Sequence, residues 1–189
     1  IIKTYPSQFE MAVGVRLIKD TEKIKLMREC IDEQKLEHFV PTKGDKYFFT
    51  KNFIGHIEKL KSKRLNKSEY MDYINTNPTL LPRIAEIKTD IAEREARGEM
   101  RNKTRYGEIE KIEKNIEKAK ELWALYELYS DKMLKNNLID FSDMINFVLD
   151  EFEKDKEFLK EVSNKYKYFL VDEYQDTNGL QNSIIFNLV

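Results

Sequence analysis

The chain has 189 residues, 33 of them basic and 34 acidic, so its formal net charge of -1 excludes a globally basic nucleic-acid-binding protein. Charged residues make up 35% of the chain while Gly (6) and Pro (4) are sparse, which is typical of a helix-rich protein. The single cysteine, Cys30, excludes an intrachain disulfide and favours a reducing compartment, so we expect a cytoplasmic protein. No run approaches 18 apolar residues, and we expect no membrane span.

The N-terminal part is predicted to begin as an extended segment and to continue as helices. Apolar residues alternate between Phe9 and Leu17, which indicates extended structure. Asp20 or Thr21 can cap the first helix, and Ser68 can cap a short later one. We predict an extended segment and three helices over the ranges 1–19, 20–37, 50–63 and 68–74.

The longest helical pattern runs from Pro82 to Leu134, with apolar residues at spacings of three, four or seven. Gly98 and Gly107 bracket a charge-rich stretch that predicts a break between two helices or a loop. The pair Asn136-Asn137 is expected to end this helical region.

The C-terminal part alternates helix and strand signals. Asp140 is expected to cap a helix through Phe152, and Asp155 a second one. The aromatic and β-branched run Tyr166–Val171 predicts a buried strand, and a helix is expected over 180–189. Helix, strand and helix in succession indicate an α/β unit, in contrast with the nearly all-helical first 135 residues.

The predicted strand ends in two adjacent carboxylates, Asp172 and Glu173. Such a pair suits a site where one carboxylate holds Mg²⁺ and the other prepares a water to attack a phosphoryl group. A solvated acidic turn is the alternative, because adjacent acidic residues are frequent. The pair alone does not decide between them.

The longer context is more specific. The string Val171-Asp172-Glu173-Tyr174-Gln175-Asp176-Thr177-Asn178, followed by Gln181, resembles motif II, the Walker B segment, of UvrD/Rep/PcrA-type superfamily 1 DNA helicases. Upstream, Asn137–Met144 is similar to a segment that these helicases carry before motif II, except that Ser142 stands where Asp is usual. Shorter similarities at Leu17–Asp20 and Ile57–Lys63 lie further upstream, in the same order as in the family.

The resemblance implies a fold and an activity. Residues 1–136 would be a helical, 1B-like DNA-binding subdomain, joined to residues 137–189 as part of a RecA-like P-loop NTPase domain with motif II. The fold class is then mainly α with a partial α/β domain. The parent would be an ATP-dependent DNA helicase that moves 3′→5′ on single-stranded DNA and unwinds duplex in repair or replication.

The resemblance also implies residue roles. Asp172 would position Mg²⁺ on ATP, and Glu173 would contact the nucleotide site as the general base. Gln175 and Asp176 would link this catalytic site to neighbouring motifs. Mg²⁺ and ATP are therefore the implied cofactors, and phosphoryl transfer needs the charge neutralisation and water positioning that such carboxylates supply.

The phosphate-binding half of such a site is not encoded here. A P-loop needs Gly-Lys-Ser/Thr, and none of the six glycines is followed by Lys. The chain starts with Ile1 and ends in an apolar run, so we expect a fragment of a longer protein. We predict that the fragment alone neither hydrolyses ATP nor unwinds DNA.

A local basic stretch lies between residues 51 and 70, where positive charges exceed negative ones by four. Such a cluster can neutralise backbone phosphates without reading sequence. By resemblance, Lys61 matches a lysine that contacts the duplex, so the partner would be a single-strand/duplex DNA junction. An ordinary solvated helix face is the alternative. The candidate DNA-contacting residues are Lys59, Lys61, Lys63 and Arg64.

Other features favour structural interpretations. The arginines between Arg94 and Arg105 alternate with glutamates, which favours a solvated helix or loop over a DNA-facing arm. Trp123 and Tyr129 have core spacing, and His38 and His56 lack a metal-ligand pattern. The competing functional class is a non-enzymatic helical module that binds DNA or protein, in which the two carboxylates merely follow a strand.

Overall fold

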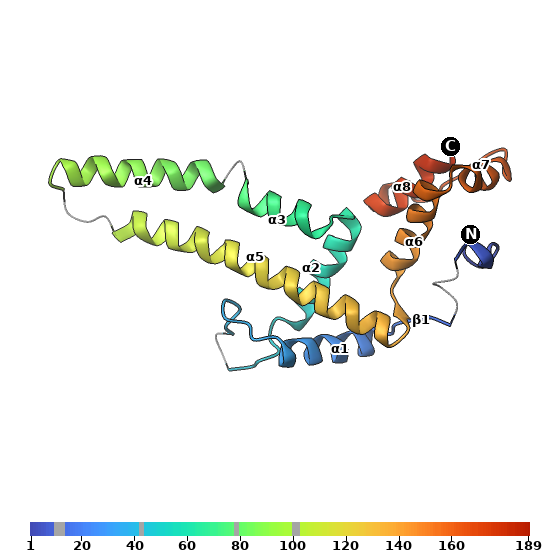
Figure 1. The fold of residues 1–189 in the computed structure, drawn as a ribbon, viewed down its shortest axis with the longest axis horizontal. Helices are drawn as coiled ribbons and strands as arrows, with labels where there is room; N and C mark the ends of the chain where they lie inside the picture. The colour runs from blue at the N-terminus through green and yellow to red at the C-terminus, as the bar shows by residue number, and fades with distance from the viewer. Residues whose placement is uncertain (10–13, 42–43, 78–79, 100–102) are drawn as a thin grey trace. The chain divides into compact units, whose positions relative to one another are not determined.

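The computed structural model describes residues 1–9, 14–41, 44–77, 80–99 and 103–189, and within these ranges the chain is mainly helical (Figure 1). This confirms the expected mainly α class. No helix in the described ranges has both the length and the apolarity needed to cross a bilayer. The elements in chain order are η1 (Pro6–Gln8), β1 (Arg16–Leu17), α1 (Asp20–Glu33), α2 (Thr50–Lys63), α3 (Lys67–Asn75), α4 (Leu80–Ala96), α5 (Lys103–Lys135), β2 (Leu138–Ile139), α6 (Phe141–Lys154), α7 (Lys156–Asn164), η3 (Tyr174–Asp176) and α8 (Gly179–Leu188).

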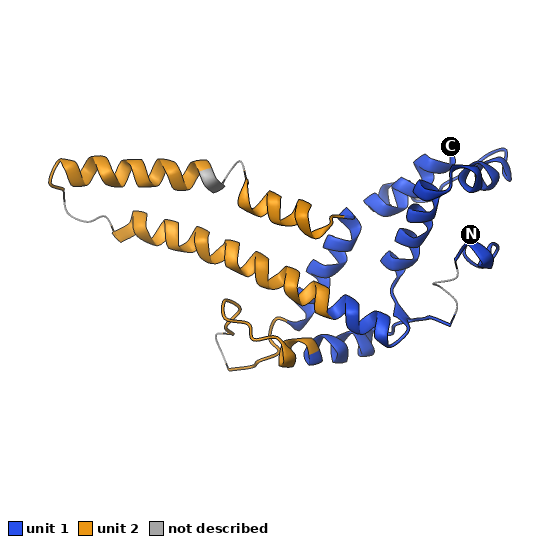
Figure 2. Ribbon diagram, in the orientation of Figure 1, with its two compact units in different colours: residues 1–29, 50–64, 129–189 blue, residues 30–49, 65–128 orange. Residues whose placement is uncertain are grey.

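The chain forms two compact units (Figure 2). Unit 1 comprises residues 1–29, 50–64 and 129–189, and unit 2 comprises residues 30–49 and 65–128. These units do not follow the expected boundary at residue 136, because β1 and α2 belong with the C-terminal helices. The assignment of residues 1–136 to a 1B-like subdomain and of 137–189 to a RecA-like domain stays a prediction.

A two-stranded parallel sheet joins distant parts of unit 1. Arg16 pairs with Leu138 and Leu17 with Ile139. The Ile18 N–H donates to the Ile139 carbonyl at 2.9 Å. This pairing brings the start of the chain to the residues just before α6. Of the expected extended segment 1–19, Met11 and Val13 lie outside the described residues.

The apolar core of unit 1 lies between its C-terminal helices and the N-terminal segment. Phe152 of α6 is fully buried and contacts Phe158 of α7, with ring centroids 5.8 Å apart. Ile184 and Leu188 of α8 pack against the same cluster. Because α6, α7 and α8 share this core, α8 is held by apolar burial. The buried residues of this cluster are Phe9, Val148, Phe152, Phe158 and Val162.

In unit 2, α4 and α5 form a long helical hairpin, as Figure 1 shows. Ile87 and Ile91 of α4 bury their side chains with Ile109 of α5. The break before α5 follows Gly98, whose φ of +72° lies in the left-handed region that glycine tolerates best. Gly107, in contrast, lies inside α5 and does not mark the break.

The caps explain where several helices begin. Asp140 and Asp155 cap α6 and α7 as predicted, each accepting backbone N–H bonds of the first turn. The cap of α3 is Asn66 rather than Ser68, because Asn66 forms a capping box with Glu69. The first helix, α1, ends at residue 33 rather than near 37.

Candidate functional site

The C-terminal half of the motif II-like string starts a helix. The Asn178 side chain accepts the Gln181 N–H at 3.0 Å, and the Gln181 side chain accepts the Asn178 N–H at 2.9 Å. This capping box satisfies two backbone donors at the start of α8. The Thr177 hydroxyl lies 2.7 Å from the Tyr174 carbonyl and 2.6 Å from the Asn182 side-chain oxygen. These residues therefore fix the join between the string and α8.

The acidic half of the string forms an exposed turn that leads into η3. Glu173 has a φ of +48°, which is uncommon for a residue other than glycine. The Glu173 N–H donates to the Asp172 carboxylate at 2.9 Å, and the Gln175 side-chain amide donates to the Glu173 carboxylate. Asp172, Glu173, Gln175 and Asp176 are all exposed. The four predicted catalytic and cofactor-binding residues thus lie together in one solvent-accessible turn.

The predicted buried strand over Tyr166–Val171 is wrong for this structure. The segment has no regular secondary structure, and Leu170 is 98% exposed. A single β-segment gains little without neighbours that take its backbone N–H and C=O groups. None of the described residues pairs with it, so its apolar character does not lead to burial. The carboxylates that follow are consequently solvated rather than buried.

Lys61 does not lie on an exposed basic surface. Its side chain is only 4% exposed, and its ammonium lies 2.7 Å from Asp140 Oδ2 and 2.7 Å from Asp143 Oδ1. The Tyr129 ring centroid is 6.0 Å from the same nitrogen. This replaces the expectation of a phosphate-contacting Lys61 with an internal ion triad, because both short contacts would have to break before the ammonium reached DNA.

The three charges of this triad shift one another's pKa values. Burial opposes ionisation of Lys61, but the two carboxylates outweigh it and raise the lysine pKa. Burial also opposes ionisation of Asp140, yet the Lys61 charge and hydrogen bond lower the pKa of that carboxyl. Burial raises the pKa of Asp143, and the Asp140 charge adds to this against the attraction of Lys61. Two carboxylates thus compete for one ammonium.

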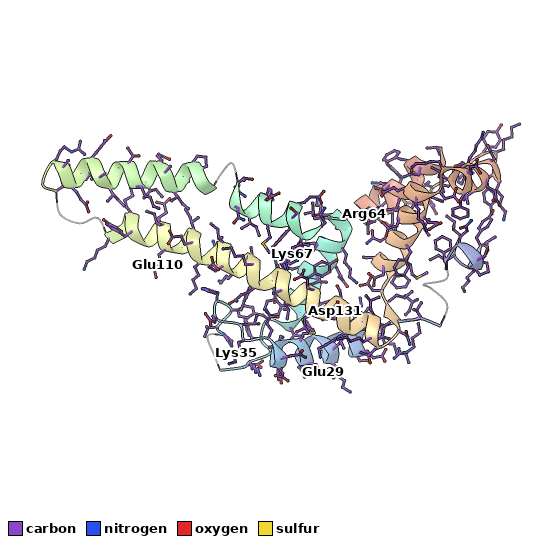
Figure 3. The ribbon with its side chains drawn as sticks, in the orientation of Figure 1. Glu29, Lys35, Arg64, Lys67, Glu110 and Asp131 are labelled. Carbon is purple, nitrogen blue, oxygen red and sulfur yellow. The ribbon has the colours of Figure 1, made fainter. Side chains whose placement is uncertain are left out.

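The remaining candidate DNA contacts divide into two classes. Arg64 lies at the C-terminal end of α2 (Figure 3), and its guanidinium is 2.7 Å from the Asp150 carboxylate and 2.9 Å from that of Glu153. Lys59 and Lys63 are exposed on α2. Of the four candidate residues, Lys59 and Lys63 are therefore the two that the geometry leaves open to phosphates.

A signal for the burial of Lys61 was present in the sequence. Phe53, Ile57 and Lys61 are spaced four residues apart, which places them on one helix face. The structure buries all three. The Asp-x-x-Asp pattern of Asp140 and Asp143 also has the form of a capping box. The sequence did not reveal that the lysine completes this box across 79 residues.

Comparison with known proteins assigns the chain to a family. The UvrD/REP helicase N-terminal domain family matches residues 1–189. The chain belongs to this family. No solved structure matches it.

Several curated relatives share part of the sequence. The probable DNA helicase II homolog of Mycoplasma capricolum is 47% identical over 62 residues, 33% of this chain and 9% of that protein. DNA helicase II of Rickettsia typhi is 44% identical over 57 residues, 30% of this chain and 9% of that protein. The ATP-dependent DNA helicase PcrA of Staphylococcus epidermidis is 37% identical over 62 residues, 33% of this chain and 8% of that protein. The match spans less than a tenth of the length of each of these relatives.

The exposed acidic turn of residues 172–176 offers the kind of oxygen ligands that Mg²⁺ uses in nucleotide sites. Mg²⁺ in such sites takes one or two protein carboxylates, with water and substrate phosphates completing its octahedron. Asp172 and Glu173 supply two adjacent exposed carboxylates. No group of three or more His, Cys, Asp or Glu side chains that could hold a metal occurs in the described part of the chain. The two carboxylates match the number that Mg²⁺ takes from the protein at nucleotide sites.

The other candidates have structural explanations. Arg94 and Arg105 both pair with Asp90, each at 3.1 Å, so the arginine-rich stretch forms ion pairs within the α4–α5 hairpin. Trp123 and Tyr129 are buried, as the core interpretation predicted. His38 lies 2.9 Å from the Glu121 carboxylate, which also accepts its backbone N–H.

Proposed function

We propose that this chain is the part of an ATP-dependent DNA helicase that supplies the metal and water-positioning carboxylates of the ATPase site. The observation that carries the proposal is the UvrD/REP family match over residues 1–189 together with the exposed Asp172–Asp176 turn. The names of the relatives, DNA helicase II and PcrA, support the same activity. In the parent protein, Mg-ATP hydrolysis would drive 3′→5′ movement on single-stranded DNA and duplex unwinding.

Each carboxylate has a distinct chemical task in this proposal. Asp172 would hold Mg²⁺, which when bound neutralises phosphate charge. Glu173 would orient the attacking water and accept its proton, which requires a carboxylate within hydrogen-bond reach of that water. The Gln175 amide donates to the Glu173 carboxylate and restricts its rotation. Asp176 would extend this polar network to neighbouring motifs.

The exposed lysines of α2 are the proposed contact with DNA. We assign it to Lys59 and Lys63, since both are exposed. Lysines of this kind interact with backbone phosphates without reading sequence, which suits a protein that moves along DNA. In the proposed division, residues 1–136 form a 1B-like DNA-binding subdomain and 137–189 belong to a RecA-like domain, in a protein of the cytoplasm.

The decisive experiment compares variants of the full-length gene product in DNA-stimulated, Mg²⁺-dependent ATP hydrolysis. Glu173→Gln removes the proton acceptor but keeps the shape and the amide contact, so the rate should fall by about 100-fold or more. Glu161→Gln, at an exposed position on α7, is the matched control and should keep the parental rate.

The purified 189-residue chain should show no Mg²⁺-dependent ATP hydrolysis, because its sequence contains no Gly-Lys-Ser/Thr segment. A clear rate from this chain that disappears in Glu173→Gln would contradict that expectation. A full-length product that binds DNA but hydrolyses ATP equally well with Gln at position 173 would instead favour a non-enzymatic binding module.

A further inference from the structure

The Lys61 triad lies where four elements of unit 1 converge. Lys61 comes from the last turn of α2, and Asp140 and Asp143 from the start of α6. Tyr129 of α5 flanks the ammonium, and β2 ends one residue before Asp140. The triad therefore joins segments that are 79 to 82 residues apart in the chain.

The same atoms build the first turn of α6. Asp140 Oδ1 accepts the Asp143 N–H at 2.9 Å, and Asp143 Oδ2 accepts the Asp140 N–H at 2.9 Å. Lys61 donates to Asp140 Oδ2 at 2.7 Å and to Asp143 Oδ2 at 2.8 Å. The ammonium thus neutralises the two carboxylates whose mutual contacts start the helix.

Further contacts continue along α6 from the end of α2. The Asn146 amide donates to the Lys61 carbonyl at 3.4 Å. Arg64 then reaches Asp150 and Glu153, one and two turns further along α6. Arg64 has a φ of +52°, so the backbone leaves α2 in a left-handed conformation at this point. The C-terminal turn of α2 is consequently tied to α6 over most of its length.

The helices α6 and α8 pack against each other in unit 1. Both helices bury residues in one apolar cluster, and α2 contacts α8 as well as α6. Leu180, in the first turn of α8, is 1% exposed. Asn178 caps α8 and is separated from the Asp172–Asp176 turn only by Thr177. A shift at the start of α6 would therefore be transmitted through packed side chains to the end of the motif II-like string.

We propose that Lys61 is a positioning residue for this string and not a DNA contact. Its ammonium fixes the start of α6. The helix α6 in turn positions α8, and α8 positions the Asp172–Asp176 turn that precedes it. The positional effect follows from the structure of unit 1 alone. Only its consequence for ATP hydrolysis rests on the proposed helicase function.

The test uses the purified chain and hydrogen–deuterium exchange of individual amides. The reporters are the amides of Asp143, Gln181 and Asn182, since each donates to a cap residue of α6 or α8. Lys61→Met should speed exchange at all three by about tenfold or more, which corresponds to about 1.4 kcal/mol of local opening. Lys59→Met, on an exposed position of the same helix, should leave them unchanged.

A triple variant separates positioning from general stability. Lys61→Met combined with Asp140→Asn and Asp143→Asn removes the buried charges together, so the melting temperature should recover. The exchange at Gln181 and Asn182 should nevertheless stay fast, because the bridge from α2 is still missing. Recovery of parental exchange in the triple variant would overturn the proposal.

A DNA-binding measurement provides an independent arm. At matched folded fraction, Lys61→Met should bind a duplex–single-strand junction as the parental chain does. If it instead lowered junction affinity and the salt dependence of binding while amide exchange stayed parental, Lys61 would be a phosphate contact and the proposal would be wrong. Loss of ATP hydrolysis by Glu173→Gln tests the proposed function separately, because it does not involve the triad.

Discussion

The two carboxylates of the ion triad should respond in opposite ways to neutralisation. Asp140→Asn and Asp143→Asn each remove one negative charge and leave Lys61 with one partner. Asn is as good an N-cap as Asp at position 140, and the amide oxygen of Asn at position 143 can still accept the Asp140 N–H, so the backbone bonds at the start of α6 survive either change. A difference between the two variants therefore reports on the charges themselves.

The direction follows from the pKa shifts. The pKa of Asp140 is lowered from 3.8, so this group contributes stability that is present above pH 3.8 and lost as pH falls through its folded-state pKa. The pKa of Asp143 is raised from 3.8, so its contribution is present below pH 3.8 and lost as pH rises through its folded-state pKa. Relative to the parental chain, Asp140→Asn should lose stability as pH rises through the acid range, and Asp143→Asn should gain it.

The size of the effect follows from the geometry. At 2.7 Å and an effective dielectric constant of 20, the gross attraction between Lys61 and Asp140 is about 6 kcal/mol. Desolvation offsets most of this attraction, and Asp143 remains as a counter-ion. We therefore expect Asp140→Asn to cost about 2 kcal/mol at pH 7, while Asp143→Asn stays within about 1 kcal/mol of the parental chain. Lys61→Met, which removes the ammonium that contacts both carboxylates, should cost about 3–5 kcal/mol.

Urea unfolding followed by circular dichroism at several pH values between 3 and 8 measures these differences. The quantity compared is the free energy of unfolding of each variant minus that of the parental chain, at equal slope against urea. A difference that falls with rising pH for Asp140→Asn and rises for Asp143→Asn supports the opposite pKa shifts of the two carboxyl groups. If the two differences changed in the same direction as pH rises, the opposite pKa shifts of Asp140 and Asp143 would be refuted.

Two paired substitutions test the fold. Phe152→Ala empties a fully buried position in the unit 1 core and should lower the free energy of unfolding in urea by about 3–5 kcal/mol. Phe141→Ala, at a position 71% exposed, should stay within about 0.5 kcal/mol of the parental chain. Equal losses for the two variants would contradict the core assignment. Gly98→Ala should destabilise by about 1 kcal/mol because φ there is +72°, while Gly107→Ala should stabilise by about 0.5–1 kcal/mol, since it lies inside α5 with open space around it. Melting temperatures of this pair that shift in the same direction would show that the break is misplaced.

Local signals in the sequence predicted most of the helices. The spacing of apolar residues gave α2 its observed bounds of 50–63, and Asp140 and Asp155 start α6 and α7 as expected. Such signals work because a cap and an apolar stripe act within one or two turns of the same helix. Phe141 departs from this pattern, because it is an apolar residue that is exposed at the first position of α6.

The strand prediction failed because a strand, unlike a helix, depends on other segments. Residues 166–171 have the aromatic and β-branched composition of a strand, but their backbone groups need a neighbouring strand as partner. The parallel pair β1–β2 forms because Arg16 and Leu17 meet Leu138 and Ile139. Composition alone does not specify such a partner, so Tyr168 and Leu170 are exposed.

The role of Lys61 was missed for a related reason. A charge count along the chain treats every lysine of α2 alike, although Lys51, Lys59 and Lys63 are exposed and Lys61 is buried. The partners of Lys61 come from residues 140 and 143, beyond a whole helical hairpin. The four-residue spacing from Phe53 and Ile57 marked the buried face, but a buried lysine becomes intelligible only when its carboxylates are located.

The motif II-like string therefore combines two kinds of residue within eleven positions. Residues 177 to 181 cap α8 and join it to the unit 1 core, and their hydrogen bonds are local and structural. Asp172, Glu173 and Gln175 make few contacts beyond the turn itself, and their carboxylate and amide groups remain open to solvent. The capping residues 177 to 181 thus position the exposed carboxylate and amide groups that precede them. Because α8 is in turn placed by α6, and α6 by Lys61, the geometry of the acidic turn depends on a residue more than a hundred positions earlier in the chain.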